Sequence, residues 1–270
     1  MFDIDTFLQT AYSFQSLRES VLRRAIEALQ LPAGSRGLDA GCGIGLQALL
    51  LAESVGAGGH VTGLDLSPEL LVYGKDIAKE AGLSERISFQ EGDVNKLPFD
   101  DDTFDWAWSL DCVGYAPMEP LRPLKELARV VKPGGSVAIL AWSYEQLLPG
   151  YPMLETRLNG TTAGIAPFVK GKKPEYHFLR ALGWFRDVGL VEARAQTFAG
   201  DAHAPLPDDC RSALESLFRM RWPSVESELT QEEWSEFQRL CLSGSADFIL
   251  DLPDYYAFFT YSLFHGKVAV

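Results

Sequence analysis

The stretch LDAGCGIGLQ, residues Leu38 to Gln47, carries three glycines at alternate positions shortly after an aspartate. A short apolar segment typical of a β-strand ends at the aspartate, and an apolar segment typical of a helix follows the glycines. A strand, a glycine turn and a helix in this order are typical of sheets that bind ligands at the carboxyl ends of their strands. The stretch therefore predicts an α/β fold with a ligand site at the turn.

The segments that follow repeat this alternation. Strand-like segments end at or near Asp39, Asp65, Asp93 and Asp111, and helical segments separate most of them. A fifth apolar strand, SVAILAW, follows the helix breaker KPGG. Strands that alternate with helices predict right-handed crossovers and a parallel sheet with both faces covered. We therefore expect the four aspartates to gather at one edge of this sheet.

The whole chain, residues 1–270, is expected to form a single domain. We expect an N-terminal helical segment in residues 1–35, with a capping box formed by Ser16 and Glu19. A cofactor-binding core follows in residues 36–142. A loop-rich cap segment, residues 143–173, comes next and is followed by a helix up to Gly189 and a strand. A helical cap segment, residues 204–251, then precedes the final strand.

Composition excludes several classes of partner and cofactor. The net charge of −13 repels nucleic acid and anionic membranes, so neither is an expected partner. The four cysteines and four histidines lie at no metal-ligand spacing, and we expect no bound metal. The first residues lack the pattern of a signal peptide, and no apolar run could span a membrane. We expect a cytoplasmic protein.

The spacing of the glycines distinguishes between two nucleotide cofactors. Dinucleotide-binding turns follow G-x-G-x-x-G, whereas here the third glycine, Gly45, comes one position early. Asp39 lies two residues before the first glycine, where a carboxylate can meet a cationic amino group. The methionine part of S-adenosylmethionine carries such a group and a dinucleotide does not. Asp65 can accept hydrogen bonds from a ribose diol, and Asp93 from an adenine amino group. The pattern favours S-adenosylmethionine.

These residues closely resemble the class I S-adenosylmethionine-dependent methyltransferases. The resemblance covers residues 38–142 through four motifs in the correct order: LDAGCGIG (38–45), GLDLSPELL (63–71), FQEGDVNKLPFDDDTFDWAWS (89–109) and RVVKPGGSVAI (129–139). Within that superfamily the chain is most similar to the ubiquinone- and menaquinone-biosynthesis methyltransferases and to small-molecule methylases. The resemblance implies a Rossmann-like, seven-stranded, mostly parallel sheet whose last strand is antiparallel, with helices on both faces and a helical cap insertion.

The resemblance also implies a set of cofactor-binding residues. The turn would be formed by Asp39, Gly41, Gly43 and Gly45. Leu66 would join Asp65 at the ribose and adenine edge, and Val94 would join Asp93 at the adenine. Leu110 and Asp111 would lie beside the methionine part, and Tyr12 would reach the cofactor from the N-terminal segment. Close packing of helix against strand is an equally good explanation for Gly45.

The acceptor side of the site has weaker signals. Tyr115 follows the fourth strand, and Tyr151, Arg157 and His177 lie in or beside the first cap segment, so these four are candidate substrate contacts. Tyr115 and His177 are also the candidate catalytic residues. We expect an enzyme that transfers a methyl group from S-adenosylmethionine to a small, apolar or aromatic molecule, leaving S-adenosylhomocysteine. The alternatives are a non-catalytic S-adenosylmethionine-binding protein and an NAD-dependent oxidoreductase.

Overall fold

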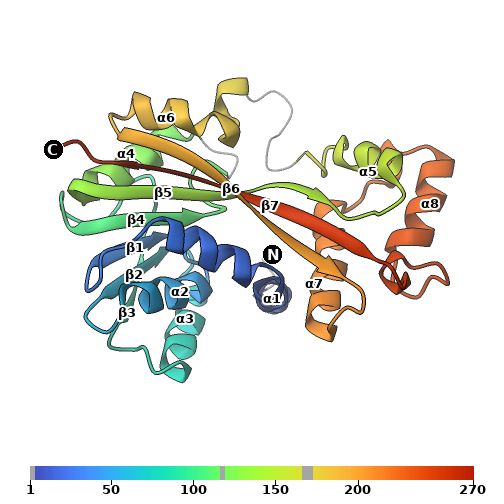
Figure 1. Cartoon of the computed structure of the whole chain (residues 1–270), viewed down its shortest axis with the longest axis horizontal. Coiled ribbons are helices and arrows are strands. Elements are labelled where there is room, and N and C mark those ends of the chain that lie inside the picture. Colours follow the sequence, from blue (N-terminus) through green and yellow to red (C-terminus); the bar gives the residue numbers. More distant parts are fainter. Residues whose placement is uncertain (1–3, 116–118, 166–172) are drawn as a thin grey trace. The chain divides into compact units, whose positions relative to one another are not determined.

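The structure, a computed structural model, describes residues 4–115, 119–165 and 173–270 (Figure 1). A single seven-stranded sheet runs through the chain in the order β3-β2-β1-β4-β5-β7-β6. Its strands are β1 (Arg36–Ala40), β2 (His60–Asp65), β3 (Ile87–Glu91), β4 (Phe104–Leu110), β5 (Val131–Gln146), β6 (Val191–His203) and β7 (Tyr256–Lys267).

The first five strands form the parallel part of the sheet. Strand β1 pairs in parallel with β2 on one side and with β4 on the other, and β3 and β5 extend these pairs outward. The strand order therefore reverses between the neighbouring strands β1 and β4. In open α/β sheets this reversal opens the crevice in which ligands bind. The glycine turn follows β1 directly, as the sequence predicts.

Strand β7 makes the sheet mixed. The backbone N–H of Gly134 donates to the carbonyl of Val268 at 2.9 Å, and the N–H of Val268 donates to the carbonyl of Gly135 at 3.0 Å. The beginning of β5 thus pairs with the end of β7, which requires the two strands to run in opposite directions. The predicted architecture, a mostly parallel sheet of seven strands with an antiparallel last strand, is confirmed.

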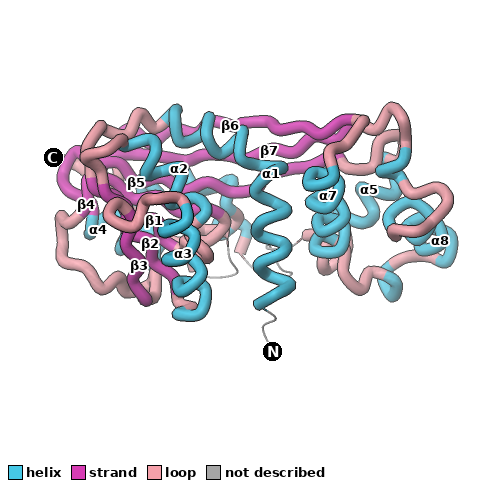
Figure 2. Tube along the Cα trace, turned by 90° about the horizontal axis from the view of Figure 1, so that it is seen from below, coloured by secondary structure: helices cyan, strands magenta, loops and turns pink. Residues whose placement is uncertain are grey.

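Helices cover the parallel strands in two pairs. Helices α2 (Leu46–Val55) and α3 (Pro68–Glu80) pack against each other and lie side by side in both views (Figures 1 and 2). Helices α4 (Leu121–Val130) and α6 (Ala181–Asp187) form the second pair. Right-handed crossovers on the two sides of the strand reversal place these pairs on opposite faces. The leucines, valines and tryptophans of β1, β2, β4 and β5 are buried between them.

Two helix ends differ in how well the sequence predicts them. Ser67 followed by Pro68 is a residue pair typical of a helix start, and Ser67 does cap α3: its hydroxyl accepts a hydrogen bond from the N–H of Leu70. The predicted capping box at Ser16 and Glu19 is wrong. Helix α1 already begins at Ile4 and runs to Ala28, and the hydroxyl of Ser16 donates to the carbonyl of Ser13 within the helix. The residues after Ser16 already show the apolar face of a complete helix. The local pattern therefore gives no sign that the helix begins earlier, at Ile4.

The segments after β4 contain more regular structure than expected. The stretch KPGG lies inside β5, at a shift in its register with β4, and β5 continues to Gln146. Helix α5 (Pro152–Asn159) then occupies part of the predicted loop-rich segment. The helix expected before Gly189 is broken into two single 3₁₀ turns and the short α6. Further along, α7 (Asp208–Arg221) and α8 (Gln231–Cys241) form the predicted helical segment.

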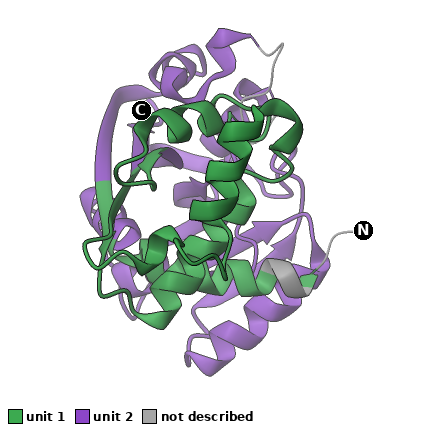
Figure 3. Cartoon of the chain, turned by 90° about the vertical axis from the view of Figure 1, so that its right-hand side faces the viewer, with its two compact units in different colours: residues 1–20, 144–171, 199–260 green, residues 21–143, 172–198, 261–270 purple. Residues whose placement is uncertain are grey.

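The residues group into two compact units (Figure 3). Unit 1 consists of residues 1–20, 144–171 and 199–260 and contains α5, α7 and α8. Unit 2 consists of residues 21–143, 172–198 and 261–270 and contains the glycine turn and the parallel strands. The division into a cofactor-binding core and two cap segments, proposed from the sequence, stays a prediction.

Candidate functional site

Asp39 lies near the end of β1 and is the most unusual charged residue of the site. The residue is 1% exposed, and its Oδ2 has no hydrogen-bond partner within the described part of the chain. Burial, with a smaller contribution from the charge of Asp65, raises the pKa of Asp39 to about 7. A buried carboxylate without a partner is costly, and a cationic donor would remove that cost.

The glycine turn has a backbone that favours glycine. The φ angles are 80° at Gly41, 53° at Gly43 and 75° at Gly45, all in the left-handed region where a side chain is strained. Space is also short. A Cβ at Gly41 would lie 2.5 Å from the sulfur of Cys112, and one at Gly45 would lie 2.7 Å from the Phe89 ring. Close packing against Phe89 is therefore one reason why a glycine is needed at position 45.

Asp65, at the end of β2, connects the glycine turn to helix α3. Its Oδ2 accepts a hydrogen bond from the N–H of Gly43 at 2.9 Å, and its Oδ1 accepts one from the N–H of Ser67 at 3.0 Å. Each carboxylate oxygen can accept a second hydrogen bond, so a ligand diol can still bind there. The next residue, Leu66, is 65% exposed at the same strand end.

Asp93 and Val94 follow β3. The Oδ1 of Asp93 accepts hydrogen bonds from the backbone N–H of Asn95 at 2.8 Å and from its side-chain amide at 2.9 Å. These bonds hold the pKa of Asp93 below its usual value. Val94 is buried. Asp93 is therefore an ionised acceptor with a fixed orientation.

Leu110 and Asp111 form the end of β4. Leu110 is buried, and Asp111 has a left-handed φ of 47°. The Oδ1 of Asp111 accepts from the N–H of Trp142 at 2.8 Å, and its Oδ2 accepts from the hydroxyl of Tyr261 at 3.4 Å. The Asp111 carboxylate thus joins β4 to β5 and β7. This structural contact was not expected from the sequence, which gave Asp111 a role beside the cofactor.

Two further residues shape the turn and were missed by sequence reasoning. The hydroxyl of Ser109 donates to the carbonyl of Ala40 at 2.8 Å and accepts from the N–H of Val113 at 3.1 Å. The thiol of Cys112 lies against Gly41. A serine inside the apolar segment FDWAWSL was the one available signal, because a buried hydroxyl needs a partner.

Tyr115 and His177, the candidate catalytic residues, belong to one aromatic group in unit 2. The ring of His177 stacks on Phe178 at a centroid distance of 4.8 Å, and the ring of Tyr115 lies 5.9 Å from the same phenyl ring. The Nδ1 of His177 accepts a hydrogen bond from the N–H of Leu179, and burial lowers the pKa of His177. Burial and this hydrogen bond to Nδ1 both favour the neutral imidazole with its proton on Nε2.

The other candidate substrate and cofactor contacts belong to unit 1. The ring of Tyr151 lies 5.7 Å from the guanidinium of Arg239. Arg157 donates to the carbonyl of Glu228 at 2.7 Å and pairs with Glu233 at 3.5 Å. Tyr12 is 50% exposed on α1. Tyr151 and Arg157 thus have packing roles, and the contacts of all three with ligands stay predictions.

The described residues contain no group of three or more His, Cys, Asp or Glu side chains that could hold a metal ion. Among the same residues, every helix is too short or too polar to cross a bilayer.

The chain is similar to known methyltransferases. Residues 38–135 match a family model described as a methyltransferase domain. "Methyltransferase GfsG" of Streptomyces halstedii is 36% identical over an alignment covering 45% of this chain and 42% of that protein. "Demethylmenaquinone methyltransferase" of Bacillus cytotoxicus is 34% identical over 52% of this chain and 58% of that protein. The chain thus matches about half the length of these relatives.

A solved structure extends the similarity beyond the aligned sequence. The structure of a SAM-dependent methyltransferase from Aquifex aeolicus superimposes with a TM-score of 0.51 and 25% identity. The superposition covers 73% of this chain and 91% of the other.

Proposed function

We propose that this chain, a member of the class I S-adenosylmethionine-dependent methyltransferases, transfers a methyl group from S-adenosylmethionine to a small, apolar or aromatic molecule. The observation that carries the proposal is the buried Oδ2 of Asp39 near the end of β1, which accepts no hydrogen bond from the residues that the structure describes. The ammonium group of the cofactor's methionine part is a donor and a cation, and it would satisfy this oxygen. The residues present thus fit the cofactor.

The other strand ends supply groups for the rest of the cofactor. Asp65 keeps acceptor capacity for the ribose diol, and Leu66 offers an exposed apolar side chain beside it. Asp93 offers an ionised acceptor for the adenine amino group, with Val94 next to it. We further assign Leu110, Asp111 and Tyr12 to the methionine end, on the resemblance alone.

When bound, S-adenosylmethionine supplies a methyl group on a sulfonium; the electrons of the broken S–C bond stay on sulfur. The work of the protein is to hold the acceptor in line with that bond and to exclude water, which together can lower a barrier by about 7–11 kcal/mol. If the acceptor must lose a proton, neutral His177 is the candidate base. Phe178, which stacks on His177, and Tyr115, whose ring contacts Phe178, would provide an apolar surface.

The acceptor class rests on two observations. The aromatic group of Tyr115, His177 and Phe178 suits a flat apolar ring. The relative from Bacillus cytotoxicus is named for demethylmenaquinone, which supports a small molecule over a macromolecule. The comparisons favour neither a non-catalytic binding protein nor an NAD-dependent oxidoreductase, since the relatives are named as methyltransferases.

Calorimetric titration with S-adenosylhomocysteine, with NAD⁺ as the control ligand, tests the cofactor. We expect micromolar binding of the first and none of the second. A folded protein that binds NAD⁺ and not S-adenosylhomocysteine would overturn the proposal. Transfer of a labelled methyl group from S-adenosylmethionine to quinols, phenols and amines then tests the reaction. Tight cofactor binding without transfer to any small molecule of an extract would instead support the non-catalytic alternative.

A further inference from the structure

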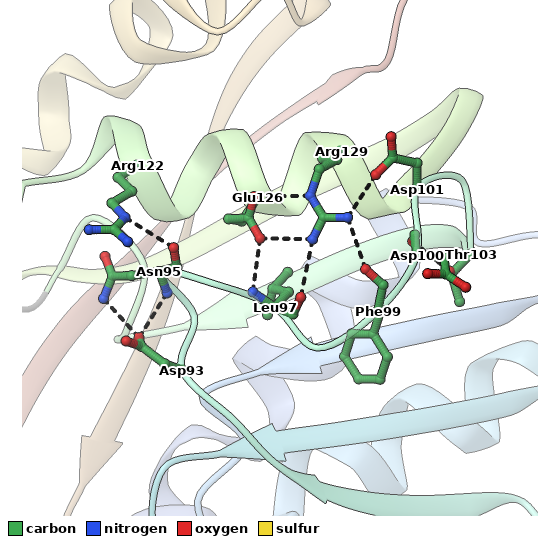
Figure 4. Close-up of polar contacts among 10 residues, drawn as sticks. All are labelled: Asp93, Asn95, Leu97, Phe99, Asp100, Asp101, Thr103, Arg122, Glu126 and Arg129. Carbon is green, nitrogen blue, oxygen red and sulfur yellow. Dashed lines mark hydrogen bonds and ion pairs between the residues drawn. The ribbon is translucent and has the colours of Figure 1, made fainter.

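The segment from Asp93 to Asp101, which follows β3, is bound along its length by helix α4 (Figure 4). Alternate residues of the segment take part: Asn95, Leu97, Phe99 and Asp101. The α4 residues that bind them are Arg122, Glu126 and Arg129. Their spacing of four and then three positions places them on one face of the helix. One helix face thus holds a whole loop of the candidate site.

Glu126 and Arg129 anchor the far end of this segment. The N–H of Leu97 donates to Glu126 at 2.8 Å, while Arg129 donates to the carbonyl of Leu97 at 3.1 Å and to that of Phe99 at 2.9 Å. Arg129 also pairs with Glu126 and with Asp101, each at 2.8 Å. These contacts are partly buried and numerous, so they contribute to the stability of the fold.

Arg122 holds the end of the segment that lies nearest Asp93. Its Nε donates to the carbonyl of Asn95 at 3.1 Å. Asn95 in turn donates its backbone N–H and its side-chain amide to the Oδ1 of Asp93. The chain of contacts runs from an exposed arginine on α4, through one asparagine, to the carboxylate (Figure 4).

The orientation of Asp93 matters because of the chemistry of its carboxylate. Both hydrogen bonds from Asn95 fall on Oδ1, so Oδ2 can accept a hydrogen bond from a ligand. An ionised carboxylate only accepts, so it favours a base that presents a donor. The 6-amino group of adenine is such a donor. Its contact requires that Oδ2 stay in one direction, which the Asn95 bonds ensure.

We propose that Arg122, acting through Asn95, is a positioning residue that orients Asp93 and so sets the preference of the cofactor site for a purine with a 6-amino group. The inference rests on the proposed function, in which Asp93 faces the adenine of S-adenosylmethionine. It adds to that function a residue on α4 that touches no ligand.

Two analogues separate this role from a structural one. The first is S-adenosylhomocysteine, and the second is its 6-deamino analogue, in which hydrogen replaces the amino group of the base. A hydrogen bond to a charged acceptor corresponds to about tenfold or more in affinity, so the full chain should prefer the first analogue by at least about tenfold. The ratio of the two dissociation constants reports on the contacts of the 6-amino group, and its change in a variant reports on the orientation of Asp93.

The variants are Arg122→Ala, Asn95→Ala and Arg122→Lys. The two alanine variants should bind S-adenosylhomocysteine more weakly and leave the affinity for the 6-deamino analogue unchanged, so the preference falls to about threefold or less. Arg122→Lys keeps a cationic donor for the carbonyl of Asn95 and should retain most of the preference. Lys132→Ala is the matched control, because Lys132 pairs with Asp105 at 2.7 Å, away from this segment.

The outcomes separate the two proposals. If the unmodified chain binds neither analogue, the proposed function fails. If it prefers S-adenosylhomocysteine and Arg122→Ala keeps that preference in full, the positioning role of Arg122 is wrong. If Arg122→Ala weakens both analogues by the same factor, Arg122 supports the fold and does not orient Asp93. Arg129 is unsuitable as a test position, since its many contacts make misfolding the expected result.

Discussion

The carboxylate of Asp65 accepts a hydrogen bond from the backbone N–H of Gly43 at 2.9 Å. The acid at the end of β2 thus holds the central glycine of the turn that follows β1. Its other oxygen accepts from the N–H of Ser67, so the same side chain also fixes the start of α3. The cofactor turn and the strand end that would bind the ribose are therefore one structural element, and a change at Asp65 must affect both.

Asp65→Asn should destabilise the protein even without cofactor. An amide has one acceptor oxygen, so one of the two N–H groups loses its partner, at a cost of about 1–3 kcal/mol. Urea denaturation with and without S-adenosylhomocysteine measures this. We expect lower stability without the ligand and a smaller gain with it. Asp76→Asn, at an exposed position of α3, is the control for loss of charge. Equal stability of the two variants would contradict the role of Asp65 in holding the turn.

Asp39 predicts a specific pH dependence of stability. Its pKa in the folded chain is about 7, whereas its ordinary value is 3.8, so the folded state binds the proton more tightly than the unfolded state. Stability from this group is therefore fully present below about pH 4 and is lost as the pH rises to about 7. The difference in unfolding free energy between the unmodified chain and Asp39→Asn should change over that interval and level off above it. A difference that is flat with pH would contradict the raised pKa.

Cofactor binding should show the opposite trend. An ammonium group beside Asp39 stabilises the ionised form, so the affinity for S-adenosylhomocysteine should rise with pH up to about 7. It should fall again only at a higher pH, where the ammonium group of the ligand's amino acid part loses its proton. Calorimetric titration from pH 5.5 to about 9 tests this. The control is 5′-methylthioadenosine, which lacks the amino acid part and should bind with little pH dependence between these limits.

The glycine turn can be tested by comparing two positions of similar backbone. Gly41 has a φ of 80° and Gly82 a φ of 68°, but a Cβ at Gly82 meets nothing within 4 Å. Gly82→Ala should cost only the left-handed strain, about 1–2 kcal/mol. Gly41→Ala should cost more, because its Cβ would clash with Cys112, and it should also weaken cofactor binding. Equal losses in thermal stability would show that the close approach of Cys112 is tolerated.

The sequence predicts the parallel part of the fold because each strand there carries its own signals. Apolar runs that end at an aspartate, the glycine turn and the cap at Ser67 are local features, and local features can be read from neighbouring residues. Ser16 illustrates the limit, since a good capping pattern lies in the middle of α1. Nothing within a few residues of Ser16 shows that the helix has already begun.

The candidate site likewise has features that local sequence predicts and contacts that it does not. Residue types at strand ends predict Asp39, Asp65 and Asp93 as acceptors, but not which of them the protein itself uses. Asp111 bonds to Trp142 and Tyr261, which lie 31 and 150 positions away along the chain. Likewise, Arg122 reaches Asn95 across 27 positions. Such contacts depend on how strands and helices pack, and a single sequence does not encode them in any local pattern.

Unit 1 contains a buried ion pair between α7 and β5. Arg221, at the end of α7, pairs with Glu145 of β5 at 2.7 Å and also donates to the carbonyl of Gly164 at 2.8 Å. The side chains are 15% and 3% exposed, so removal of one charge leaves the other poorly compensated. Glu145→Gln should lower the unfolding free energy by about 3 kcal/mol, which is the lower end of the range for removing one partner of a buried ion pair.

A matched exposed pair provides the control for this prediction. Arg23 and Glu53 are also 2.7 Å apart, but their side chains are 47% and 51% exposed. Glu53→Gln should therefore cost at most about 1 kcal/mol. Urea denaturation of both variants makes the comparison, and the double variant Glu145→Gln/Arg221→Met extends it. Because an apolar replacement of a buried pair is often neutral, the double variant should recover part of the lost stability. If Glu145→Gln costs no more than Glu53→Gln, the pair is solvated and its burial has no energetic consequence.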